Sequence, residues 1–144
     1  MTATVKYDEV EVGQEIPAQT YPVQRIDLVR YAGASGDFNP IHWSDRVATK
    51  VGLPGVIAHG MLTMALTSRA VTTWAGGDPG AIAEFSVRFA RPILVPDDET
   101  GTELTVTGVA KEDPSGLVRI DITAVCAGEK VLAQARALVR SVAV

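Results

Sequence analysis

The stretch GMLTMALTSRAVTTW, residues 60–74, decides the fold of this 144-residue chain. Placed on a helix, its apolar residues cover most of the circumference: Met61, Leu62, Met64, Ala65, Leu66, Ala70, Val71 and Trp74. A helix that is apolar nearly all round is typically buried. The sequence therefore predicts a long central helix covered by the rest of the chain.

The pattern changes to a period of two after this helix. Phe85, Val87 and Phe89 alternate with polar residues, as expected of a half-buried strand. Further strands are predicted over residues 103–110, 117–127 and 130–142. For the last of these an Ala-rich helix is the alternative, but the short preceding turn favours a hairpin. These patterns predict one α+β domain over residues 1–144, a curved antiparallel sheet wrapped around the central helix.

Two shorter helices are predicted before the central one. An apolar residue at every third position predicts a helix over residues 26–35 that ends at Gly33 or Gly36. Ser44 is a favourable N-cap for a second helix, which Gly52 ends.

The charge of the chain argues against a nucleic-acid partner. Thirteen Lys and Arg residues stand against 17 Asp and Glu, a formal net charge of −4, so no basic surplus is available to neutralise phosphates or an anionic membrane surface. A local cluster of Arg88, Arg91 and Lys111 could still meet an anionic acyl carrier protein or coenzyme A. No apolar run is long enough to insert into a membrane.

Cys126 is the only cysteine, which excludes an internal disulfide and any multi-cysteine metal site. A lone cysteine fits a reducing compartment, and we expect the cytoplasm. Residues 1–12 contain several charged side chains and no continuous apolar core, so we expect no signal peptide there.

The loop SGDFNPIHW, residues 35–43, places a carboxylate, an amide and an imidazole within six residues. Asn39 precedes a proline and is therefore kept out of the helical conformation, so Asp37 and His42 lie on a fixed bend. Taken singly, Asp37 is more simply a turn residue and His42 a surface histidine. Together, in a proline-braced loop beside a buried helix, they indicate an acid/base pair.

The sequence AHGM, residues 58–61, leads into the central helix. Backbone N–H groups near Gly60 are among the unpaired donors at a helix N-terminus, where the helix dipole favours negative charge. Gly60 is therefore a candidate oxyanion donor, with a tight turn as the alternative. We expect His59 to support the turn, and Ser68 to be either a packing residue or a hydrogen-bond partner of the loop.

Three segments together, SGDFNPIH at 35–42, AHGM at 58–61 and FSVRF at 85–89 followed by Arg91-Pro92, resemble the hydratase-2 motif. This motif marks the MaoC-like family of (R)-specific enoyl thioester hydratases and dehydratases, and the resemblance runs from about residue 8 to the end of the chain. Within that family, NPIHW, AHGMLTM and GDPGA are most similar to catalytic subunits of the mycolic-acid-pathway (3R)-hydroxyacyl-ACP dehydratases.

The resemblance implies a hot-dog fold in which a short-helix overhang carries the catalytic loop. It also implies an acyl-CoA or acyl-ACP substrate, (3R) stereochemistry, and no metal or redox cofactor. It assigns Asp37 and His42 as the catalytic pair, Asn39 as a loop support, Gly60 as the N–H donor to the thioester carbonyl, and Ser68 as a helix residue hydrogen-bonded near the pair.

We therefore expect a hydro-lyase that interconverts (3R)-hydroxyacyl and trans-2-enoyl thioesters in fatty acid metabolism. Asp37 and His42 would exchange the protons while Gly60 N–H stabilises the thioester oxygen. Which member is the acid and which the base is left open, since the two can titrate as a coupled pair. A hot-dog thioesterase and a non-catalytic acyl-channel subunit remain the alternatives. Relatives include homodimers and heterodimers with a homologous hot-dog subunit, and both remain open.

Overall fold

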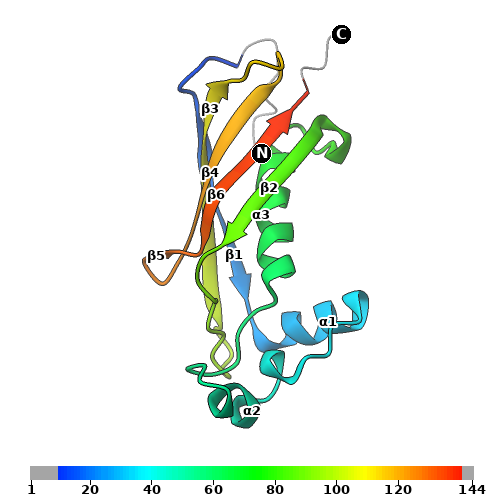
Figure 1. Cartoon of the computed structure of the whole chain (residues 1–144), viewed down its shortest axis with the longest axis vertical. Coiled ribbons are helices and arrows are strands. Elements are labelled where there is room, and N and C mark those ends of the chain that lie inside the picture. The colour runs from blue at the N-terminus through cyan, green and yellow to red at the C-terminus, as the bar shows by residue number, and fades with distance from the viewer. Residues whose placement is uncertain (1–9, 141–144) are drawn as a thin grey trace.

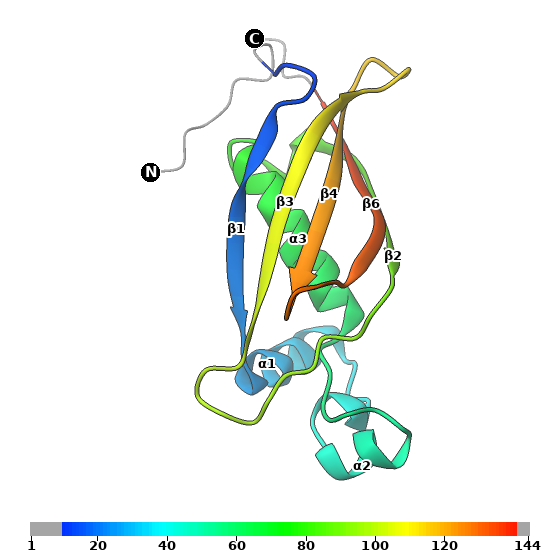
Figure 2. The same ribbon diagram turned by 90° about the vertical axis from the view of Figure 1, so that its left-hand side faces the viewer.

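A long helix and the sheet that curves over it form the main body of the molecule. The computed structural model describes residues 10–140, and its longest helix, α3, spans Gly60–Trp74. Six antiparallel strands form one sheet along one side of this helix (Figures 1 and 2). The predicted α+β architecture, a curved sheet wrapped around a central helix, is confirmed.

The strands pair in the order β1-β3-β4-β6-β2, with β5 beside β4, so β1 and β2 are the edges. The strands predicted over residues 103–110 and 117–127 are present, and the segment after the 127–129 turn is a strand and not a helix. The last two residues of the strand predicted over 130–142 lie outside the described residues. Residues 1–9, part of the segment in which no signal peptide is expected, also lie outside them. The strands are β1 Glu15–Val23, β2 Ile82–Phe89, β3 Thr102–Glu112, β4 Val118–Cys126, β5 Glu129–Lys130 and β6 Leu132–Val139.

Strand β1 was not predicted from the sequence. It contains Pro17 and Pro22, and proline in a strand removes a ladder hydrogen bond, so the segment lacks a strand signal. The structure accommodates both prolines because β1 is an edge strand, paired only with β3, and because its register shifts between Ile16 and Gln19.

Both short helices form where the sequence predicted them. Helix α1, Arg25–Ser35, ends at Gly36, which adopts the left-handed conformation with φ of +76°. In helix α2, Asp45–Lys50, the Ser44 side chain accepts the Val47 N–H as an N-cap. The apolar spacing that predicted α1 does not mark its buried face, however. Of the three residues in that spacing, Ile26 and Val29 are 47% and 58% exposed and only Ala32 is buried, on the same side of the helix as Leu28.

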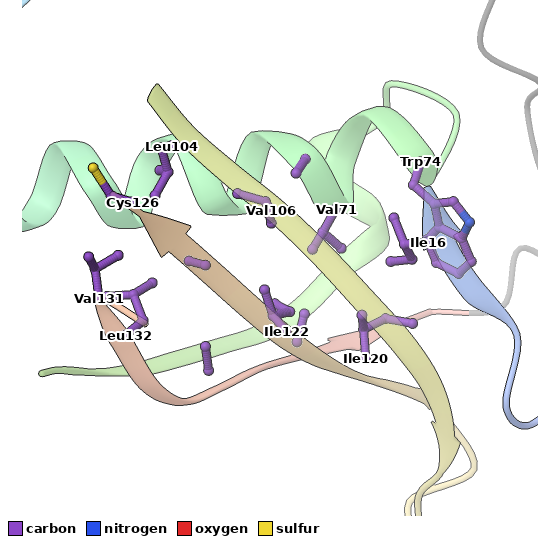
Figure 3. Close-up of a cluster of buried hydrophobic side chains, with 14 of the residues drawn as sticks. Ile16, Val71, Trp74, Leu104, Val106, Ile120, Ile122, Cys126, Val131 and Leu132 are labelled. Atoms are coloured by element: carbon purple, nitrogen blue, oxygen red, sulfur yellow. The ribbon is translucent and has the colours of Figure 1, made fainter. Parts of the chain in front are cut away.

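The core lies between α3 and the concave face of the sheet, where Figure 3 shows the labelled side chains gathered. Leu104 and Ile120 on the sheet are fully buried, and Val71 and Trp74 on α3 are almost so. Alternate residues of β4 are buried, as the period of two predicted. The apolar faces that the two periods define in the sequence thus meet in one core.

Helix α3 is buried on one face only, and this corrects the prediction that it is covered all round. Its buried residues are Thr63, Thr67, Ala70, Val71 and Trp74. Met61 is 55% exposed and Ala65 is also exposed. The reason is geometric: a single sheet curves over one side of the helix, and within residues 10–140 no element covers the other (Figure 1).

Helices α1 and α2 lie together at one end of the molecule, beyond the ends of the strands (Figure 1). An ion pair fixes this overhang: Arg25 donates to both carboxylate oxygens of Asp45 at 3.0 Å, and its Nε donates to the Val95 carbonyl at 2.6 Å. Asp45 also accepts the Val56 N–H at 3.1 Å. The hydrogen bond from Arg25, with that from Val56, lowers the pKa of the Asp45 carboxyl.

The entry to α3 is held in a short antiparallel contact. The Ala58 N–H donates to the Ile93 carbonyl at 2.8 Å, and the Val95 N–H donates to the Val56 carbonyl at 3.0 Å. The overhang, the start of α3 and the segment after β2 are therefore fixed to one another. No helix within residues 10–140 is both long and apolar enough to cross a membrane.

We expect Leu104→Ala to lower the free energy of unfolding by about 2–5 kcal/mol, because it opens a cavity between β3 and α3 at a side chain with no exposed surface. Leu94→Ala, the same truncation at a side chain that is 44% exposed, should cost less than about 1 kcal/mol. Urea unfolding followed by circular dichroism measures both. Equal losses would contradict this description of the core.

Candidate active site

The loop between α1 and α2 is braced by its own side chains. Asp37 Oδ1 accepts the Asn39 N–H at 3.1 Å, and Asn39 Oδ1 accepts the Ile41 N–H at 3.2 Å. Pro40 begins a short 3-10 helix, η2, spanning Pro40–His42. Each side chain thus satisfies the backbone two residues ahead, which fixes the bend between Asp37 and His42.

His42 has a defined tautomer. Its ring is buried, with 8% of the residue exposed, and its Nδ1 lies 2.7 Å from the Ile57 carbonyl oxygen. A carbonyl only accepts hydrogen bonds, so Nδ1 must carry the proton. In the neutral ring Nε2 is therefore an acceptor, the state that a general base requires.

Asp37 and His42 face each other across a short gap. Asp37 Oδ2 lies 3.8 Å from His42 Nε2, and the aspartate side chain is 51% exposed while the histidine is buried. Both atoms accept hydrogen bonds when the ring is neutral, so they do not bond directly. A water or hydroxyl group between them can donate to both, which is the arrangement that proton exchange with a bound hydroxyl needs.

His59, the N-cap residue of α3, connects the loop to the central helix. Its Nε2 lies 3.1 Å from the Asp37 carbonyl and must donate to it, and its ring stacks on that of His42 with centroids 3.8 Å apart. Its Nδ1 is buried without a hydrogen-bond partner among the described residues. His59 thus holds the backbone of one member of the pair and the ring of the other.

Burial lowers the pKa of His59, and the neighbouring His42 ring adds to this effect. The hydrogen bond to the Asp37 carbonyl and the charge of Asp37 act in the opposite direction but are weaker. A neutral His59 avoids placing two cations in contact when His42 takes up a proton during proton exchange.

Asp37, His42 and His59 each place one potential metal ligand within 4.8 Å of the others. The two rings are stacked and their planes are inclined by only 23°, so their in-plane lone pairs lie in two nearly parallel layers and do not converge on one ion. Each ring also donates one N–H to a backbone carbonyl. This geometry favours proton transfer over metal coordination.

A cavity of about 310 Å³ opens beside His42 and the start of α3. Gly60 lines it, and as the first residue of the helix its N–H has no intrahelical partner. A Cβ added to Gly60 would lie 3.2–3.4 Å from the Phe89 ring, so a larger residue crowds the cavity. The cavity is therefore lined both by the His42 ring and by the first residue of a helix, at the positive end of the helix dipole. It is lined by His42, Ile57, Ala58, Gly60, Thr63, Phe89, Ala90, Arg91, Pro92, Ile93, Val131 and Leu132.

A second hollow of about 440 Å³ lies between α1, β1 and α3. Tyr31 lines it, and the Tyr31 ring is 4.8 Å from that of His59, centroid to centroid. A row of three rings, Tyr31, His59 and His42, therefore separates this hollow from the first. Leu62 and Leu66 contribute apolar lining, which suits a hydrocarbon chain.

The structure brings Asp37, His42, His59 and Gly60 to one place, and Asn39 braces the same loop. Ser68 is different: its carbonyl accepts the Thr72 hydroxyl at 3.1 Å, and no hydrogen bond joins its side chain to the loop within residues 10–140. It lies eight residues beyond Gly60, roughly 12 Å along the helix.

Tyr31 and Thr63 were not predicted as site residues from the sequence. Tyr31 carries no motif, although it lies on the helix that leads into the loop. Thr63 is one turn after His59, and that spacing on a helix was its only signal.

Comparisons with known proteins show the family of the chain. A family model described as MaoC like domain matches residues 8–126. The chain is 36% identical over 106 residues to 3-hydroxyacyl-thioester dehydratase X of Mycobacterium tuberculosis, covering 68% of this chain and 36% of that protein. It is 33% identical over 128 residues to the (R)-specific enoyl-CoA hydratase of Rhodospirillum rubrum, covering 88% of this chain and 85% of the hydratase.

Among solved structures, one described as a MaoC-like dehydratase superposes with a TM-score of 0.86 at 42% identity. The match covers 95% of this chain and 42% of that one. The chain therefore spans well under half of the length of the mycobacterial dehydratase and of this structure, and most of the length of the bacterial hydratase.

The lowered pKa of His59 predicts a pH-dependent stability. Unfolding returns this histidine to its ordinary pKa near 6.5, so below that pH the unfolded chain binds the proton more readily and the folded state loses stability. We expect the wild type to lose stability as pH falls through 6.5 toward the lower folded pKa, and His59→Gln to lose less over the same interval. Glutamine can still donate to the Asp37 carbonyl. Urea unfolding at about pH 7.5 and about pH 5.5, roughly one unit on either side of the ordinary histidine pKa, measures the difference. Identical pH dependence in both proteins would contradict the prediction.

Proposed function

The chain belongs to the MaoC-like domain family, and from this membership and the geometry around Asp37 and His42 we propose that it interconverts trans-2-enoyl and (3R)-hydroxyacyl thioesters in fatty acid metabolism. The observation that carries the proposal is the 3.8 Å gap between Asp37 Oδ2 and His42 Nε2, beside a cavity that Gly60 lines. The (3R) configuration rests on the family. The thioester's carrier, coenzyme A or acyl carrier protein, and the partner subunit belong to the same proposal.

In the hydration direction a water molecule lies between Asp37 and His42 and donates to both. Its oxygen bonds to C3 of the enoyl group while one proton passes to the pair, with neutral His42 Nε2 as an acceptor. The C2–C3 π electrons shift to give an enolate, whose charge falls on the thioester oxygen beside the Gly60 N–H. The pair then returns a proton to C2, and dehydration is the reverse sequence.

The expected losses of reaction rate are large enough to measure. General acid/base catalysis contributes roughly 10²–10⁴-fold, and one oxyanion donor about 10²–10³-fold. The donor is a backbone group that mutation cannot remove, but the Gly60 position tests the space in front of it. The side chains of Asp37 and His42 can be changed directly.

The alternative functions differ in the product that is released and in whether they require the Asp37–His42 pair. A thioesterase directs the same water at the carbonyl carbon and releases a free acid and a thiol, whereas a hydratase leaves the thioester intact. A non-catalytic subunit that shapes an acyl channel has no requirement for a braced Asp–His pair. The apolar hollow beside Tyr31 is our candidate for the acyl chain in each case.

We expect the purified protein to hydrate short trans-2-enoyl-CoA substrates to the (3R) alcohol, and Asp37→Asn and His42→Gln each to lower kcat by about 10²-fold or more. Both changes are nearly isosteric and remove proton transfer. Loss of the enoyl absorbance gives the rate, and chiral chromatography gives the configuration.

Asp97→Asn makes the same chemical change at an exposed residue and should retain wild-type kcat. Thermal unfolding of each variant checks that the fold is kept. Free acid as the product would replace the proposal by a thioesterase, and a variant with half of the wild-type kcat would remove that residue from the mechanism.

We further propose that the active form is a dimer, with a second copy or with a homologous subunit. The uncovered face of α3 with Met61 and Ala65, and the half-exposed Phe89 on edge strand β2, support this proposal. An edge strand has unpaired backbone N–H and C=O groups to which a second strand can bond.

We propose a cytoplasmic location. Cys126 is buried and forms no disulfide, as expected in a reducing compartment.

Dilution tests the dimer directly. We expect light scattering to give twice the mass of one chain and activity to fall as the dimer dissociates, and we expect Ala65→Glu to shift this equilibrium toward the monomer by placing a charge on the uncovered face. Val12→Glu, at a residue 61% exposed elsewhere, is the control. A fully active monomer would rule out the dimer requirement, and an inactive homodimer rescued by a homologous subunit would select the heterodimer.

A further inference from the structure

A cavity of about 750 Å³ lies on the outer face of the sheet, across strands β2, β4 and β6. Ile120 and Ile122 of β4 are buried against α3, so the residues that alternate with them, Arg119 and Asp121, point to the opposite face. The polar lining consists of Ser86, Arg88, Arg119, Asp121, Gln134 and Arg136. Neither Asp37 nor His42 lines this cavity, so it lies outside the proposed acid/base chemistry.

A bulge in β6 opens the cavity. Asp121 pairs with Arg136, and the Val131 N–H donates to the Ala124 carbonyl. Between these two contacts β4 advances by three residues, whereas the chain that enters β6 advances by five, so β6 holds two extra residues. Gln134 lies in the extra segment with φ of +49°, a conformation that residues other than glycine seldom adopt. The β2–β6 register also shifts between Ser86 and Arg88. Bulges of this kind redirect side chains and often lie at functional sites.

Positive charge predominates in this cavity. Arg119 pairs with Asp121 at 3.0 Å, and Arg136 Nε donates only to the Ser86 hydroxyl, at 3.4 Å. Within residues 10–140, neither Arg88 nor Arg136 has a carboxylate within ion-pair distance. Three guanidinium groups therefore face one carboxylate, on a chain whose net charge is −4.

The positive field extends beyond the cavity. The pKa of Asp113 is lowered first by hydrogen bonds from Ser115, and the charges of Arg119 and Arg136 lower it further. The Asp113 carboxylate accepts a hydrogen bond from the Ser115 hydroxyl at 2.6 Å. It does not line the cavity.

The cluster that the sequence suggested for an anionic carrier does not form. Arg91 pairs with Glu129 at 2.8 Å, and Lys111 lines a separate hollow with Asp113. Only Arg88 of the three belongs to the outer cavity. The sheet instead combines Arg88 with two arginines that lie 31 or more positions later in the sequence, on different strands.

We infer that the arginine cavity, defined by Arg88, Arg119 and Arg136, binds an organic ligand that carries two or more phosphate groups. Guanidinium groups match phosphate oxygens with paired hydrogen bonds, and arginine keeps its charge at any physiological pH. The separation of the three groups over three strands and the volume of the cavity exceed what one inorganic phosphate fills.

The position of the cavity makes the nucleotide half of coenzyme A the occupant of choice. Arg88 directly precedes Phe89, whose ring lies beside Gly60 in the cavity next to His42. The two cavities therefore lie on opposite faces of the same end of β2. An extended pantetheine arm is longer than the roughly 10 Å between packed layers, so it can pass beyond the end of β2 and leave the edge of that strand free for a second subunit. The choice of coenzyme A rests on the proposed function, but the existence of a phosphate site does not.

Titration calorimetry at low salt tests binding without turnover. We expect adenosine 3′,5′-bisphosphate to bind the wild type, and Arg88→Gln/Arg136→Gln to weaken this binding by about tenfold or more, because it removes charge-assisted hydrogen bonds. Arg46→Gln/Lys50→Gln removes the same charge from α2 and should bind like the wild type. Thermal unfolding verifies each fold, and Arg136→Gln alone replaces the double variant if that does not fold.

Equal weakening in the control variant, or inorganic phosphate binding as tightly as the bisphosphate, would overturn the inference. So would the absence of binding to the wild type. Kinetics separates this outcome from the proposed function: with intact chemistry, the arginine variant should raise KM for an enoyl-CoA and leave KM for the corresponding enoyl-pantetheine unchanged. Hydration of both substrates with no difference between variants would retain the proposed function and reject the arginine site.

Discussion

The hydrogen bond from His59 to the Asp37 carbonyl is the contact on which the site depends. It joins two segments that the chain separates by 22 positions, the loop after α1 and the start of α3. Because the same ring stacks on His42, one side chain fixes both members of the pair relative to the helix N-terminus. Its burial lowers the pKa of His59 and so favours the neutral ring in this position.

The fold supports this contact from several sides. Arg25 and Asp45 hold α1 against α2, and the antiparallel contact between residues 56–58 and 93–95 holds the entry of α3. The site therefore lies where the overhang meets the main body, at the N-terminal end of α3 (Figure 1). A loop that is braced on rigid elements can maintain a short gap between two acceptor atoms, which an isolated loop would not.

The two faces of the sheet differ in what they contact. The concave face packs on α3 and forms the core that Figure 3 shows, so its residues are apolar and alternate with the pleat. The convex face is free of that constraint, and there a bulge gathers arginines around a cavity. Strand β2 connects the two, because its end contributes Arg88 to one face and Phe89 to the other. A thioester with a phosphorylated carrier would use both.

The sequence by itself determined the elements whose signals are local. The spacing of apolar residues located α3, β3 and β4, and Ser44 and Gly36 marked helix ends through their own backbone preferences. The compact SGDFNPIHW loop indicated the Asp37–His42 pair, because proline and Asx turns act within a few residues. Tertiary structure decided what depends on distant partners. Strand β1 forms despite its prolines because β3 accepts it at an edge, Ile26 and Val29 stay exposed although their spacing is helical, and one face of α3 stays uncovered because a single sheet reaches only the other. The His42 tautomer depends on the Ile57 carbonyl, and the arginine cavity on three strands brought into register, so neither is encoded within any one segment.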